Sequence, residues 1–143
     1  MYKNILVPVD VFETGLADKA LSHAQFLAQS SAGQIHLLYV IPAFSPALTR
    51  GFISDAKKME EHLINTAKEN LSALVKKAGL PEDVAQLYIR SGNIRDEVTK
   101  LADELKIDVV IIGSRNPNIR THLLGSEAAN IVRYAHVPVF VIR

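Results

Sequence analysis

The chain has 143 residues, the usual size of one domain, so we expect residues 1–143 to form a single domain. It contains no cysteine, which excludes disulfides, thiolate metal ligands and cysteine nucleophiles. The 16 Lys and Arg residues against 15 Asp and Glu residues give a net charge of +1, without the basic excess typical of nucleic-acid-binding proteins.

Membrane association and export are not indicated by the sequence. The longest apolar run, residues 137–142, is far shorter than the about 20 residues that span a bilayer. The first residues lead directly into a strand-like segment and lack the apolar stretch and cleavage site of a signal peptide. We therefore expect a cytoplasmic protein that binds neither membrane nor nucleic acid.

Two kinds of segment alternate along the chain. Continuous apolar, β-branched runs suit strands that are covered on both faces, as in a parallel sheet. They occupy residues 5–9, 35–41, 84–89, 108–112 and 137–142. Apolar residues at helical spacing follow the first four of them, at 16–27, 59–78, 94–105 and 124–135. This alternation predicts an α/β fold, a Rossmann-like open parallel sheet of five strands with right-handed crossovers and helices on both faces.

Glycine and polar residues mark the ends of the predicted helices. Gly33 and Gly79 follow the first two helical segments, and we expect each to adopt the left-handed conformation that closes a helix. Thr14, Ser54 and Asn93 precede helical segments and are candidate N-caps. Between the second strand and the second helix, the irregular stretch around two prolines, residues 42–53, favours a mobile loop or lid.

The predicted sheet has one edge at which a ligand is expected. In open α/β sheets, ligands bind outside the carboxyl ends of the strands, where the strand order reverses. Residues 8–10, 40–42 and 113–116 follow the first, second and fourth strands, so we expect them to meet there. Asp10 could bind a ribose hydroxyl or a metal ion, or it could serve only as a helix-entry residue that accepts backbone N–H groups.

The segment after the fourth strand is the strongest candidate for a phosphate site. Gly113 would let a ligand approach the backbone closely, and Gly125 and Ser126 open the last helix, whose free N–H groups attract anions. Arg115 and His122 add positive charge or hydrogen-bond donors nearby. The alternative is an ordinary loop with a Gly-Ser helix cap.

Several familiar motifs are missing from the sequence. There is no P-loop sequence G-x-x-x-x-G-K-[ST], and no G-x-G-x-x-G follows the first strand. The five histidines show no metal-ligand spacing, and no Ser-His-Asp order or paired carboxylates indicate hydrolysis. We therefore predict a binding site without catalytic residues or metal ligands.

Four stretches of the sequence match a known family. They are residues 4–10 (NILVPVD), 109–114 (VVIIGS), 124–129 (LGSEAA) and 136–143 (HVPVFVIR). With them the chain resembles the universal stress proteins over essentially its whole length, and most closely the small bacterial F/G type.

The resemblance implies the strand order 3-2-1-4-5 and, in the nucleotide-binding branch of the family, a motif G-x2-G-x9-G-[S/T] that holds ATP. Here Gly113 matches the first glycine, and Gly125 and Ser126 match the last pair. Asn116 replaces the middle glycine, and the spacer after it is one residue shorter. Asparagine tolerates a left-handed backbone better than most residues, so the turn could survive the replacement.

By the same resemblance, the expected cofactor is ATP or another adenine nucleotide, with or without Mg²⁺. Asp10 would lie near the ribose or the adenine, and Val40 would offer backbone groups to the adenine edge. The full set of expected nucleotide-binding residues is Pro8, Val9, Asp10, Val40, Gly113, Ser114, Arg115, Asn116, His122, Gly125, Ser126 and Glu127.

The family also implies a homodimer formed through the last strand. The apolar run at residues 137–142 agrees, because an exposed apolar edge strand needs a partner. We therefore expect a dimeric, ATP-binding stress-response or regulatory protein. Two alternatives stay open: a weak ATPase or phosphotransferase in which Arg115 or His122 stabilises phosphate charge, and an interaction module without nucleotide.

Overall fold

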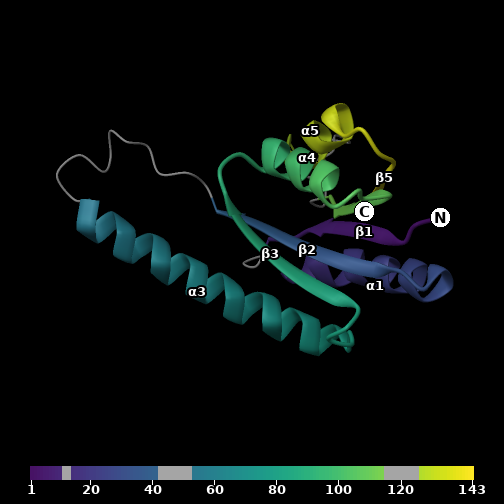
Figure 1. Cartoon of the computed structure of the whole chain (residues 1–143), viewed down its shortest axis with the longest axis horizontal. Helices are drawn as coiled ribbons and strands as arrows, with labels where there is room; N and C mark the ends of the chain where they lie inside the picture. Colours follow the sequence, from purple (N-terminus) through teal and green to yellow (C-terminus); the bar gives the residue numbers. More distant parts are fainter. Residues whose placement is uncertain (11–13, 42–52, 115–125) are drawn as a thin grey trace.

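The computed structural model describes residues 1–10, 14–41, 53–114 and 126–143 (Figure 1). Its elements are β1 (Asn4–Pro8), α1 (Thr14–Ser31), β2 (Gln34–Ile41), α3 (Ile53–Ala78), β3 (Ala85–Ser91), α4 (Ile94–Glu104), β4 (Val109–Gly113), α5 (Ser126–Tyr134) and β5 (Val139–Ile142). They follow one another in the predicted order. The loop expected at 42–53 lies outside the described residues, except that Ile53 begins α3.

The five strands form one parallel sheet in the order β3-β2-β1-β4-β5. This order confirms the predicted fold. β1 lies in the centre, with β2 and β3 on one side of it and β4 and β5 on the other. The edges of the sheet are therefore β3 and β5.

Side chains along each strand alternate between two core layers. Ile5 and Val7 of β1 belong to the core that α1 and α3 cover, together with Ile35 of β2. Leu6 points to the opposite face and packs in a second core with residues of α4 and α5, among them Ile131. Figure 1 shows the two helix pairs on opposite sides of the sheet. Cover on both faces explains why the central strands are almost continuously apolar.

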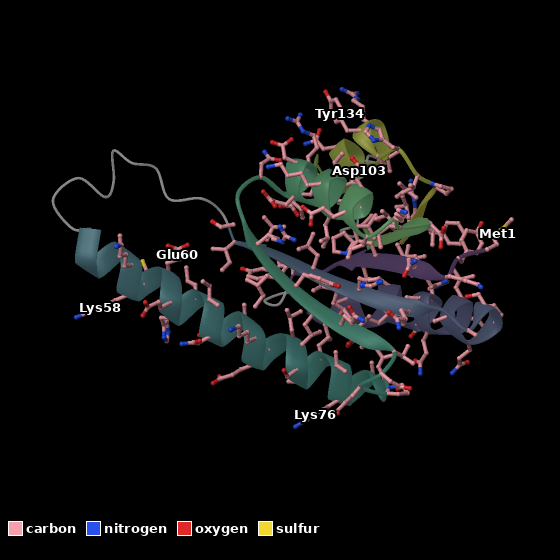
Figure 2. All side chains as sticks on the ribbon, viewed as in Figure 1. Met1, Lys58, Glu60, Lys76, Asp103 and Tyr134 are labelled. Atoms are coloured by element: carbon pink, nitrogen blue, oxygen red, sulfur yellow. The ribbon has the colours of Figure 1, made fainter. Side chains whose placement is uncertain are left out.

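The longest helix, α3, is amphipathic. Ala67, Leu71 and Leu74 are buried against the sheet, at the spacing of one helix face. Figure 2 shows Lys58 and Lys76 on the same helix pointing away from the sheet. Its amino-terminal turns extend past the carboxyl end of β2 (Figure 1). In the part of the chain that the structure describes, no helix is long and apolar enough to cross a membrane.

The helix ends agree with the sequence at two of the predicted positions. The side chain of Asn93 accepts a hydrogen bond from Arg95 N–H at 2.9 Å, which confirms the N-cap of α4. Gly79 follows α3 with a φ of 69°, which confirms its left-handed conformation. The predicted N-caps Thr14 and Ser54 are wrong, because Thr14 is the first residue of α1 and Ser54 the second residue of α3, whereas an N-cap precedes its helix.

Gly33 has a different role from the one predicted. The left-handed residue after α1 is Ala32, with a φ of 53°, and Gly33 has no positive φ. Gly33 lies where two chain segments cross: a Cβ added there would come within 2.7 Å of Tyr2 O and 2.9 Å of Lys3 O. Glycine is needed because the backbones approach closely, not because the helix must close.

Candidate functional site at the carboxyl ends of the strands

The carboxyl end of β1 leads from the core to an exposed carboxylate. Pro8 and Val9 are buried, and Val9 N–H donates to Leu38 O at 2.9 Å, which holds the end of β1 against β2. Asp10 follows directly and is exposed. The chain therefore passes from buried apolar residues to an exposed carboxylate within three consecutive residues.

Val40 directs its main chain toward β1 just past the end of that strand. In a parallel ladder, alternate residues bond to the strands on opposite sides. Gln34 N–H donates to Lys3 O, and Leu38 O accepts from Val9 N–H, so the even-numbered residues of β2 face β1. The bond from Val9 is the last of this ladder among the described residues. The N–H and C=O of Val40, the next even-numbered residue, therefore point to the position beyond the end of β1.

The end of β4 is tied to β5. Gly113 lies opposite Ile142 in the register, and Ser114 N–H donates to Ile142 O at 2.8 Å. Ser114 is only 2% exposed. Because the sheet uses the main-chain N–H of Ser114, a ligand would meet this residue through its hydroxyl or its carbonyl.

The last helix begins where the sequence predicts a phosphate site. α5 starts at Ser126, and its amino-terminal N–H groups form the positive end of the helix dipole. Glu127 is exposed in the first turn, where its carboxylate stabilises the helix and lowers the positive potential that an anion would meet. The predicted residues Arg115, Asn116, His122 and Gly125 lie outside the described residues.

Tyr39 lies beside the candidate site and was not predicted from the sequence. It belongs to β2 and is 9% exposed, in the core layer that α1 and α3 cover. Burial raises the pKa of its phenol, and the Asp10 carboxylate raises that pKa further. Asp10 is therefore close enough to act on Tyr39 electrostatically. The sequence feature that could have pointed to Tyr39 is its position as the one aromatic, hydroxyl-bearing residue in the aliphatic stretch at the end of β2.

The described groups at the ends of β1 and β2 suit a ligand with hydroxyls and a polar planar edge, and the start of α5 suits an anionic group. The Asp10 carboxylate accepts hydrogen bonds, the Val40 main chain offers one donor and one acceptor, and the start of α5 attracts anions. Within the described ranges, no three His, Asp or Glu side chains gather as metal ligands do.

The strand order reverses between β1 and β4, so the crossovers on the two sides of this point cover opposite faces of the sheet. This arrangement defines an open, doubly wound α/β protein, a class whose ligands bind at the carboxyl ends of the strands. The model of the universal stress protein family matches residues 1–143. The chain belongs to the universal stress protein family.

Individual relatives agree with this assignment. Universal stress protein G of Escherichia coli O157:H7 is 49% identical over 143 residues, which span 100% of both chains. The structure of protein MJ0577 of Methanocaldococcus jannaschii has a TM-score of 0.80 at 28% identity, covering 99% of this chain and 96% of that one. The Archaeoglobus fulgidus universal stress protein in complex with dAMP has a TM-score of 0.68 at 24% identity, covering 99% and 98%. The similarity to protein G confirms the predicted likeness to the F/G type.

Proposed function

We propose that this protein binds an adenine nucleotide, with ATP as the first candidate, at the carboxyl ends of β1, β2 and β4. The observation that carries the proposal is the main chain of Val40, whose N–H and C=O point beyond the last β1–β2 bond among the described residues. Adenine offers an amino donor beside a ring-nitrogen acceptor, which matches a donor and an acceptor held on a rigid strand.

The adenosine would lie across the end of β1. Pro8 and Val9 are buried there and would form an apolar wall along the base and sugar. Asp10 would accept a hydrogen bond from a ribose hydroxyl, a role for which an exposed carboxylate at the end of the central strand is suited.

The phosphates would lie toward the end of β4 and the start of α5. Gly113 would leave room for them, Ser114 would offer its hydroxyl, and the N–H groups that follow Ser126 would attract their charge. Mg²⁺ would accompany the phosphates if the nucleotide binds as its magnesium complex. Arg115, Asn116, His122, Gly125 and Glu127 complete the proposed set.

The relative from Archaeoglobus fulgidus is in complex with dAMP, and it shares the fold of this chain. At 24% identity, that likeness bears on the fold alone. The proposal therefore depends on the residues of this chain at the carboxyl ends of its strands.

The protein would act as a homodimer through β5 in a cytoplasmic stress response, with the nucleotide as a regulator. β5 is an edge strand whose four residues are all apolar and half-buried. Because Ser114 N–H bonds to Ile142 O, the alternation turns the N–H and C=O groups of Val139 and Val141 outward. A second copy could continue the sheet there, which would cover this apolar edge.

Isothermal titration calorimetry with the purified protein tests nucleotide binding. We expect ATP to bind, and Asp10→Ala to weaken it by about tenfold or more, since a hydrogen bond to a charged group contributes about 1.5–3 kcal/mol. Asp83→Ala is the matched control, because Asp83 is an exposed carboxylate just before β3, at the opposite end of the sheet. An absence of heat at millimolar ATP, with and without Mg²⁺, would refute the proposal.

Single-turnover hydrolysis separates regulatory binding from a weak ATPase. Bound ATP that stays intact supports a regulatory role. If Asp10→Ala and Ser126→Ala both slow hydrolysis, the protein is a weak ATPase instead. If neither change affects the rate, the activity belongs to a contaminating enzyme.

A further inference from the structure

The second edge of the sheet, β3, borders a groove that no part of the proposed nucleotide site uses. The groove has a volume of about 540 Å³ and lies between α3 and β3. Its lining residues are Ile64, Lys68 and Ser72 of α3 and Leu87 and Ile89 of β3. Leu87 is 39% exposed, and in the groove it lies with two further apolar residues, Ile64 and Ile89.

The hydrogen bonds between β2 and β3 determine which way the main chain of β3 faces. Ile35 N–H donates to Val84 O at 2.8 Å, and Gly92 N–H donates to Ile41 O at 2.9 Å. In the parallel register between these bonds, the even-numbered residues of β3 bond to β2. The odd-numbered residues of β3 therefore direct their N–H and C=O groups away from the sheet.

Two residues thus present both their main chain and their side chains at this edge. Ala85 N–H already bonds to Pro81 O, so the outward-facing pairs of groups in the middle of β3 belong to Leu87 and Ile89. The side chains of the same two residues line the groove. An added strand would find hydrogen-bonding groups and an apolar groove in register with each other.

Lys68 gives the groove a positive charge. It follows Ile64 by one helical turn, and in the described part of the chain no carboxylate forms an ion pair with it. An incoming strand that places a carboxylate near Lys68 would gain a favourable interaction, and one that places a lysine there would be repelled.

We propose that the β3 edge binds an extended segment of a partner protein, which adds a parallel or antiparallel strand beside β3. The segment has apolar side chains that enter the groove over Leu87 and Ile89, and an acidic side chain that pairs with Lys68. This docking surface is separate from the nucleotide site and does not depend on it.

The charge argues that the partner is not a second copy of this chain. Two copies joined at β3 by a two-fold axis would pair their strands antiparallel, with Leu87 and Ile89 of both copies near the axis. Each copy would bring its own Lys68 to the same place, and two like charges would oppose the contact.

A defined peptide tests the proposal on the full-length protein. The probe is fluorescein-labelled Thr-Val-Thr-Glu-Thr-Val-Thr, whose alternate side chains are apolar or acidic, and its partner probe has Lys in place of Glu. We expect the acidic peptide to bind more tightly in fluorescence anisotropy. In ¹H–¹⁵N spectra, we expect the amide signals of Leu87 and Ile89 to shift and to exchange more slowly with solvent.

Matched variants locate the contact. Lys68→Glu should weaken the acidic peptide by about two- to fivefold, as for an exposed ion pair, and should reverse the preference between the two peptides. Leu87→Pro removes an outward N–H that the sheet does not use, so the edge should tolerate it and lose the peptide. Leu87→Val keeps the N–H and should keep binding, and Val141→Pro, which alters the β5 edge instead, should leave binding unchanged.

Three results would overturn the proposal. The first is that neither peptide binds the wild-type protein. The second is that Val141→Pro abolishes binding or that the shifted amides belong to β5. The third is that Lys68→Glu leaves the preference between the peptides as it is, and this charge exchange decides the question even if the proline variant does not fold.

Discussion

Ala32 and Gly33, which follow α1, are expected to change the free energy of unfolding in opposite directions when Gly33 becomes Ala and Ala32 becomes Gly. An alanine Cβ at position 33 would be 2.7 Å from Tyr2 O, about 0.7 Å short of the 3.4 Å at which ordinary contact begins. Tyr2 O accepts from Ser31 Oγ at 2.8 Å, and Lys3 O, also too close, accepts from Gln34 N–H at 2.7 Å. Straining two hydrogen bonds of about 1 kcal/mol each and overpacking the crossing should make Gly33→Ala cost about 2–4 kcal/mol of unfolding free energy.

The residue before it should behave in the reverse way. Ala32 has a φ of 53°, which costs an L-residue about 1–2 kcal/mol, and glycine would remove this cost while adding unfolded-state entropy. Ala32→Gly should therefore stabilise the protein by about 0.5–1 kcal/mol. Ala73→Gly is the matched control, because Ala73 is exposed inside α3, where the same change should destabilise by about 1 kcal/mol.

Urea denaturation followed by circular dichroism gives the free energy of unfolding for all three variants. If Gly33 only closed the helix, as the sequence suggested, Gly33→Ala would cost no more than about 1 kcal/mol. Such a small loss, or an Ala32→Gly variant as destabilised as Ala73→Gly, would refute the close-approach explanation.

Three further outcomes are expected. Asn93→Ala should cost about 1 kcal/mol in urea denaturation because it removes the N-cap of α4, whereas Asn65→Ala inside α3 should cost nothing. Burial lowers the pKa of His36 from its ordinary 6.5. The stability that its neutral form contributes should therefore be present above pH 6.5 and fall as the pH drops toward the folded-state pKa. If the melting temperature of His36→Gln falls with pH as steeply as that of the wild type, this explanation is contradicted. Asp10→Asn should lower the raised pKa of Tyr39, measured by tyrosinate absorbance with Tyr39→Phe as the reference; an unchanged titration would mean that the two groups do not interact.

The strands, the helices and the parallel sheet were predictable because local signals agree with one another. Apolar runs alternate with helical stripes, and that alternation leaves no antiparallel arrangement of short connections. The strand order could not be predicted from these local signals, because the same alternation also permits the order 2-1-3-4-5. The order 3-2-1-4-5 followed only from the family resemblance, and the structure confirms it.

Other features depend on contacts between distant residues and leave little trace in the sequence. Gly33 reads as a helix terminator, yet its role comes from Tyr2 and Lys3, about thirty positions earlier. Tyr39 reads as part of an apolar strand, yet its phenol lies within the field of Asp10, which belongs to another strand's end. Periodicity cannot reveal either relation, because each one arises from the way β1 and β2 lie together.

Main-chain direction is the information that side-chain patterns lack, and it underlies both proposed surfaces. A period of two shows which face of the sheet a side chain takes, but not which neighbouring strand receives the N–H and C=O of the same residue. Among the described residues, the β1–β2 ladder leaves the main chain of Val40 unused, because β1 ends at Pro8, before the position opposite Val40. The alternation along β3 turns the main chain of Leu87 outward, and no further strand covers it because β3 is the last strand of the sheet on that side. A β1 longer by two residues would use the Val40 groups in the ladder, and a sixth strand would use those of Leu87. The binding capacity of both surfaces therefore depends on where the sheet stops as much as on the residues that it contains.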